Sequence, residues 1–189
     1  MEAALADERF IKEVCSALDQ ADVLADVPRR HLQHGLRHLG ERDVFDAWPP
    51  LIIGLEGAFT DVAIEQGIAV RKGNHVHLAD QNGAPLPEKI KSVEGVARQL
   101  GVDSSTDFGD FLLRQVYGGQ GNPFRHGSAQ EGIRDRAICL AVAVIGWLDA
   151  FVTPGSIDLL SRAVMQELAK RDDADDAGPD QPEDSQPPV

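Results

Sequence analysis

The sequence predicts an all-α protein: a helical bundle of about six or seven helices with a small β-hairpin or loop insertion. Three observations lead to this prediction. Apolar residues recur at helical spacing through most of the chain before residue 172. Residues 70–87 break that pattern. After residue 171 the composition changes to Asp, Glu, Pro, Gln and Ser, which is typical of a disordered segment. We therefore expect one helical domain over residues 1–171 and an acidic tail over residues 172–189.

The N-terminal third is expected to contain three amphipathic helices. Pro28 is expected in the first turn of the second helix and Gly40 at its end, because proline fits a first turn and glycine often ends a helix. Pro49 and Pro50 are likewise expected in the first turn of the third helix. The expected helices cover residues 2–21, 28–40 and 45–67.

The insertion is expected to be a short hairpin. His75–Leu78 alternates between polar and apolar residues, and Asp80–Gly83 has the composition of a tight turn. Pro87 is then expected to open a helix that ends at Gly101.

Two more helices are expected to frame a glycine-rich segment. Ser104–Asp107 resembles a helix start, and the helix that follows is expected to stop at Gly118. Ser128–Glu131 has the Ser-x-x-Glu form of a capping box, so a helix should begin at Ser128 and continue through Val152. That helix is apolar around most of its circumference, which places it at the centre of the bundle.

Charge and composition narrow the classes of function. The formal net charge is −13, and the residues after 171 contribute seven acidic side chains and no Lys or Arg, which leaves −6 on the rest. A broad basic surface for nucleic acid is therefore not expected, and any such contact should be local. Cys15 and Cys139 are expected to be buried free thiols in a reducing compartment.

No membrane segment or leader is expected. The N-terminal residues have neither a basic region nor a long apolar region. The most apolar stretch, Ala137–Val152, contains Asp149 and is shorter than the roughly 20 residues that span a bilayer. We expect a cytoplasmic protein that does not contact a membrane.

Gly121–Gly127 is the strongest candidate for a functional site. His126 precedes the expected cap at Ser128 by two residues, so its imidazole should lie at the positive end of a helix, where anions are favoured and His protonation is disfavoured. Arg125 is adjacent, and Arg134 follows within the next helix as a possible anion-binding residue. These groups suit metal-independent RNA cleavage, which needs a base, an acid and a cation at the phosphorane. The alternative is a structural turn with His126 bonded to backbone.

This segment resembles a motif of the HEPN superfamily. Asn122-Pro-Phe-Arg-His126-Gly127, followed by a capped apolar helix, is most similar to members associated with abortive infection. The run Leu51–Phe59, which carries Glu56 inside a Leu/Ile-rich face, also resembles a helix of such proteins. The resemblance covers roughly residues 45–153.

The resemblance implies a ribonuclease site. In that family an Arg, followed four to six residues later by a His, forms the site, and two protomers usually combine their motifs. Asn122 matches the family's Asn and His126 matches its His, but Gly121 stands at the Arg position. The missing cation would then come from Arg125 or from Arg114 in the preceding helix.

Two hypotheses follow from the resemblance. The first is an endoribonuclease or toxin effector in antiviral defence (abortive infection) or a toxin–antitoxin system. It would act as a homodimer, with His126, Arg125 and Asn122 as catalytic residues and Arg114, Arg134 and Glu56 in binding. The second is a catalytically inactive module that binds RNA, a nucleotide or a partner protein in a defence or regulatory complex. Neither hypothesis calls for a cofactor or a metal.

Three histidines, at positions 31, 34 and 38, lie on one side of the second helix. Together with His75 and His77 they suggest a metal site, but no carboxylate or cysteine falls at metal-binding spacing. We favour a basic, solvated helix face that docks RNA or an acidic partner. The acidic tail is interpreted as a solubilising segment, or alternatively as a nucleic-acid mimic that shields a basic site.

Overall fold

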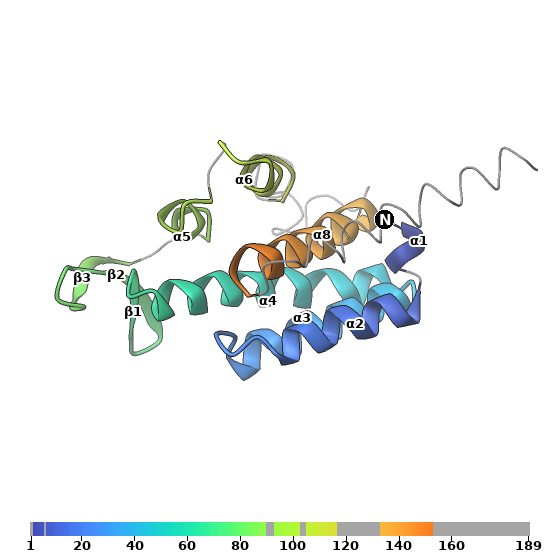
Figure 1. Ribbon diagram of the computed structural model, residues 1–189, viewed down its shortest axis with the longest axis horizontal. Helices are drawn as coiled ribbons and strands as arrows, with labels where there is room; N and C mark the ends of the chain where they lie inside the picture. Colours follow the sequence, from blue (N-terminus) through green and yellow to red (C-terminus); the bar gives the residue numbers. More distant parts are fainter. Residues whose placement is uncertain (1, 6, 90–92, 103–104, 117–132, 153–189) are drawn as a thin grey trace, which may run out of the picture.

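The computed structural model describes residues 2–5, 7–89, 93–102, 105–116 and 133–152. Its described part is mostly helical with one small antiparallel sheet, which confirms the predicted fold class (Figure 1). The elements are α1 (Glu2–Leu5), α2 (Glu8–Asp19), α3 (Asp26–Gly40), α4 (Val44–Glu65), β1 (Ala69–Lys72), β2 (His75–Ala79), β3 (Pro85–Lys89), α5 (Val93–Gln99), α6 (Asp107–Phe111), the π-helix η1 (Leu112–Val116) and α8 (Ile133–Phe151).

The long helix α4 lies in the middle of the bundle. Helix α3 lies along one side of it with α2 packed against α3, α8 lies along another side, and the sheet sits beside the C-terminal end of α4 (Figure 1). Helix α4 contacts α3, α8, α5 and β1. The helix predicted for residues 128–152 corresponds to α8, and it shares the central position with α4. The expected capping box at Ser128 lies outside the described residues.

Glycines allow α3 and α4 to pack closely. A Cβ atom at Gly35 would lie 2.6 Å from Leu51 Cγ and 2.8 Å from the backbone oxygen of Ala47. A Cβ atom at Gly54 would lie 2.7 Å from Leu32 Cγ. Real Cβ atoms do not approach other heavy atoms so closely, so side chains at these two positions would push the helices apart.

Aliphatic side chains fill most of the core, and aromatic rings join α4 to α8. Trp147 is fully buried. Phe151 meets Phe59 of α4 edge to face, with ring centroids 5.9 Å apart, and it also lies 6.2 Å from the Trp147 ring. Such ring pairs add to the stabilisation from apolar burial.

Two details of the N-terminal helices differ from the sequence prediction. The single helix expected over residues 2–21 is divided, because the Asp7 side chain accepts a hydrogen bond from Arg9 N and starts a new helix. Helix α4 begins at Val44 because Asp43 caps it, so Pro49 and Pro50 lie in the second turn rather than the first. The second helix ends at Gly40, as predicted.

The predicted hairpin is part of a three-stranded sheet of order β1-β2-β3. The turn at Asp80–Gly83 is confirmed: the Asp80 side chain accepts hydrogen bonds from Asn82 N and Ala84 N, and Gly83 has a φ of +78°. The helix expected to open at Pro87 is a wrong prediction. Pro87 lies in the edge strand β3, where its missing N–H costs little, and α5 begins at Val93.

The helix expected after Ser104–Asp107 is present in two parts. Thr106 caps it by accepting a hydrogen bond from Gly109 N at 3.0 Å. The chain then changes from the α-helix α6 to the π-helix η1, and its predicted stop at Gly118 lies outside the described residues. Of the described helices, none is long and apolar enough to cross a membrane.

Candidate functional site

The residues predicted to carry the chemistry lie outside the described part of the chain. This holds for Gly121, Asn122, Arg125 and His126. Arg134 belongs to the first turn of α8, and its side chain is also outside the description. Their catalytic and binding roles therefore stay predictions.

The structure places the other two predicted site residues on separate elements. Arg114 lies on η1, its side chain is 73% exposed, and it forms an ion pair with Asp110 one turn earlier. Glu56 is half-buried on α4, and its backbone carbonyl accepts a hydrogen bond from Thr60 Oγ1. Arg114 is therefore exposed to solvent, and it lies a few residues before the segment 121–127 in the sequence. Its ion pair with Asp110 would have to open before it could bind a phosphate.

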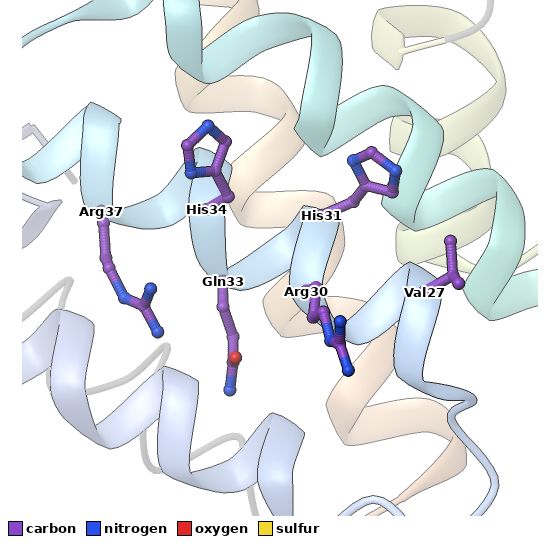
Figure 2. Close-up of a pocket in the computed structure, with 6 residues that line it drawn as sticks. All are labelled: Val27, Arg30, His31, Gln33, His34 and Arg37. Carbon is purple, nitrogen blue, oxygen red and sulfur yellow. The ribbon is translucent and has the colours of Figure 1, made fainter.

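A groove on the outer side of α3 is a candidate ligand site among the described residues. Its volume is about 440 Å³. In Figure 2, Arg30, Gln33 and Arg37 extend toward α2, whereas His31 and His34 lie on the side toward α4. We call this site the α3 groove, and its lining residues are Val27, Arg30, His31, Gln33, His34 and Arg37.

The periodicity of α3 explains why these side chains share one surface. Most of the lining residues follow one another at intervals of three or four, so they form a stripe along the helix. The opposite side of α3 is buried against the bundle. Its buried residues are Leu32, Gly35, Leu36 and Leu39. The groove histidines, His31 and His34, are therefore separate from the buried leucine face of α3.

The α3 groove is cationic in its chemistry. It presents two guanidinium groups and two imidazoles, and no carboxylate is among its lining residues. Arg30 is 80% exposed and lies 3.7 Å from Asp26, a weak and screened surface pair. Gln33 is held by hydrogen bonds to Cys15 O and to the Asp19 side chain. A guanidinium group can donate two parallel hydrogen bonds to two oxygens of one phosphate, so the groove suits an anionic ligand.

A second hollow, between α2 and α3, is lined by more acidic than basic side chains. It measures about 450 Å³ and shares Arg37 with the α3 groove, but Glu8, Asp19 and Glu41 also line it. Its thiol, Cys15, is a half-buried free cysteine; burial raises the pKa of that thiol, and the neighbouring Arg37 acts in the opposite direction. Cys139 is also half-buried, with its pKa raised by burial, rather than fully buried as predicted. The acidic lining makes this hollow a poorer phosphate site.

The structure does not assemble the histidine metal site considered from the sequence. His77 is buried in β2, and its Nδ1 lies 2.8 Å from the carbonyl oxygen of Leu86. Within the described part of the chain, neither His75 nor His77 joins the α3 histidines in a metal-binding group. His38 instead lies near Asp43 and Asp46, a grouping that the sequence analysis missed because these carboxylates follow the end of α3.

Asp61 is a buried carboxylate that the sequence analysis did not single out. It is 9% exposed on α4, its Oδ2 accepts a hydrogen bond from Ala25 N at 2.9 Å, and its Oδ1 lies 3.7 Å from Arg71 of β1. Burial raises the pKa of Asp61, although both partners act to lower it. Asp61 therefore joins α4 to the turn before α3 and to the sheet, which is a structural role.

Comparison with known proteins adds no relative: no family model matches the chain, and no curated protein or solved structure matches it significantly.

Proposed function

We propose that this protein is a HEPN-like, metal-independent endoribonuclease with His126 as its general acid/base. The observation that carries the proposal is the segment Asn122-Pro-Phe-Arg-His126-Gly127, which precedes in sequence the capping box predicted at Ser128 and the apolar helix α8. An imidazole at that position would be held near neutral by the positive end of a helix, and a neutral imidazole is the form that accepts a proton.

The proposed chemistry is transesterification within RNA. One His126 removes the proton of a ribose 2′-OH, the resulting oxygen attacks the adjacent phosphorus, and an acid protonates the leaving 5′-oxygen. Arg125 stabilises the charged phosphorane, and Asn122 orients either the imidazole or the phosphate. In a homodimer, the His126 of a second copy is available as the acid when its imidazole is protonated, so one site contains both groups.

The α3 groove supports an RNA ligand in this proposal. Arg30 and Arg37 provide donors for phosphate oxygens on a protein whose net charge is −13. The local placement of these cations agrees with the expectation that nucleic-acid contact is confined to a small area. Arg114 provides another exposed cation, adjacent in sequence to the proposed catalytic segment.

The proposal is tested with purified full-length protein and a labelled single-stranded RNA, in the presence of EDTA. We expect His126→Ala to reduce cleavage by about 10²–10⁴-fold, the usual contribution of a general acid/base. Arg125→Ala should reduce it by about 10²–10³-fold. His75→Ala is the matched control, because His75 is exposed on β2. Equal cleavage by the wild type and His126→Ala would exclude the proposed catalytic role.

A second candidate function is a catalytically inactive module that binds RNA, and Gly121 at the position of the motif Arg favours it. Under this alternative the wild type binds RNA without cleaving it. Gly121→Arg would supply the missing cation and is expected to introduce cleavage that His126→Ala then removes. Cleavage by the wild type that depends on Arg125 would instead favour the enzyme.

The biological setting is part of the same proposal. An RNA-cleaving effector of antiviral defence or of a toxin–antitoxin pair acts in the cytoplasm and is held inactive by a partner protein or by the absence of a trigger. If a partner protein provides this restraint, expression in a bacterial host that lacks the partner should arrest growth and degrade RNA with the wild type but not with His126→Ala. Unchanged growth and intact RNA with both would count against an autonomous toxin.

A further inference from the structure

The turn between α3 and α4 brings together a histidine and two aspartates. His38 lies in the last turn of α3, Asp43 caps α4, and Asp46 lies in the first turn of α4. One potential ligand atom from each residue lies within 4.8 Å of the other two. Imidazole nitrogen and carboxylate oxygen are both ligands of Zn²⁺ and related divalent transition metals.

Nδ1 of His38 is an unsatisfied polar atom in this cluster. It is buried and has no hydrogen-bond partner among the residues that the structure describes. The nearest carboxylate oxygens are Glu41 Oε2 at 3.7 Å and Asp43 Oδ2 at 3.9 Å. These separations are too long for hydrogen bonds. A buried polar atom without a hydrogen-bond partner lowers the stability of the folded state, and a bound ligand would satisfy Nδ1.

The same separations are close to those of a metal centre. A tetrahedral Zn²⁺ ion with bonds of about 2.0–2.2 Å holds its ligand atoms roughly 3.3–3.6 Å apart. The His38–Glu41 and His38–Asp43 distances exceed that range by only a few tenths of an ångström. Small side-chain rotations would therefore bring the donors to a common cation.

The backbone and the neighbouring ring hold the cluster in place. Asp43 N donates a hydrogen bond to the carbonyl oxygen of His38 at 2.8 Å, and Asp46 N donates to Asp43 Oδ1 at 3.3 Å. The His34 ring meets the His38 ring edge to face with centroids 4.4 Å apart. Asp43 Oδ1 thus serves the helix cap, while Oδ2 faces His38.

From the orphaned Nδ1 and the carboxylates around it, we propose that His38, Asp43 and Asp46 form a binding site for one divalent transition-metal ion of the zinc class, with Glu41 or water completing the coordination. The ion would join the C-terminal end of α3 to the N-terminal end of α4. This site does not depend on the proposed ribonuclease activity, whose chemistry uses no metal.

Calorimetric titration of the metal-free full-length protein with ZnCl₂ tests the proposal. We expect one Zn²⁺ per chain and an increase in Tm, because an ion that binds the folded state alone stabilises it. His38→Gln and Asp43→Asn should each weaken binding at least about tenfold, since even outer-shell partners of metal ligands contribute this much. Asp43→Asn keeps a side chain that caps helices well. His31→Gln, on the same helix outside the cluster, is the matched control.

Two further measurements make the result decisive. Circular dichroism of each variant establishes whether it is folded. If a variant is not folded, Asp46→Asn is measured in its place. Co²⁺ in place of Zn²⁺ should give visible absorption bands of a low-coordinate site that disappear in His38→Gln. Equal Zn²⁺ affinity of the wild type, His38→Gln and Asp43→Asn would overturn the proposal, as would binding lost equally in His31→Gln or no binding at one equivalent.

Discussion

The two sides of α3 differ in what they contribute. On the inner side, Gly35 and the buried leucines pack so tightly against α4 that a single added methyl group would collide with Leu51 and the Ala47 backbone. On the outer side, Arg30 and Arg37 line a groove without contributing to the core. The comparison indicates that the inner face of α3 determines its packing against α4, whereas the outer face provides the candidate ligand surface. The two roles are separate because opposite faces of a helix contact different surroundings. Changes on the inner side should therefore alter stability, and changes on the outer side should alter binding.

The largest effect is expected on the inner side. Gly35→Ala should lower the free energy of unfolding by about 1–2 kcal/mol, because overpacking typically costs about 1–3 kcal/mol and outweighs the gain of up to about 1 kcal/mol in helix propensity. Urea denaturation measures the change. Gly40→Ala is the control, because a Cβ there would meet its nearest atom at 3.4 Å. A Gly35→Ala variant as stable as the control would show that the α3–α4 contact at this position tolerates a side chain.

An intermediate effect is expected on the outer side. The double change Arg30→Gln and Arg37→Gln should weaken binding of single-stranded RNA about tenfold and reduce the slope of log K against log salt by about 1.4, because each lost phosphate contact contributes about 0.7 for single strands. Its urea midpoint should stay near that of the wild type.

A double change of the same charge, Arg9→Gln and Lys72→Gln, is the control for this experiment. Both residues are exposed outside the α3 groove. RNA affinity and salt slope that fall equally in the two double variants would mean that binding follows net charge alone. A large loss of stability in the groove variant would contradict the separation of the two sides.

The smallest effect concerns Asp61, a charge on the inner side of the bundle. Its folded pKa lies above the ordinary value of 3.8, so the folded state binds the proton more tightly than the unfolded state. The resulting stabilisation is fully present below pH 3.8 and is lost as the pH rises through the folded pKa. The stability of the wild type relative to Asp61→Asn should therefore fall as the pH rises through that window.

Urea denaturation at several pH values from about 3 to 7 measures this difference. Asn keeps an oxygen that can accept the Ala25 N–H, so the comparison isolates the charge. Asp22→Asn is the control, because Asp22 is an exposed carboxylate in the nearby turn. A difference between the wild type and Asp61→Asn that does not change with pH, or that changes in the opposite direction, would contradict the role assigned to burial.

Local signals in the sequence predicted the elements best. Helical periodicity and glycine identified α3 and its end, and the Asp80–Gly83 turn was found because its side-chain hydrogen bonds are made within a few residues. The mistake at Pro87 has a local cause as well, because a proline that can open a helix can also occupy an edge strand. Only pairing with β2 decides between the two.

Functional sites depend on tertiary contacts that local sequence patterns do not predict. The basic side of α3 was predicted from helical periodicity, because all its groups lie on one element. The His38 cluster was missed, because Asp43 and Asp46 approach the imidazole only after the chain turns between α3 and α4. The segment around His126 is still a prediction from sequence, and its place in the fold is outside the described residues.

The sequence by itself determined the mainly helical class, the amphipathic division of α3 and the resemblance of residues 121–127 to a ribonuclease motif. These features follow from side-chain order along one local segment. Only the tertiary structure decided that α4 shares the centre of the bundle and that Gly35 and Gly54 set the α3–α4 distance. It also placed His38 Nδ1, which has no hydrogen-bond partner among the described residues, beside the carboxylates of Glu41 and Asp43. Those results depend on which surfaces meet, and that is fixed by packing between segments rather than by the pattern within any one of them.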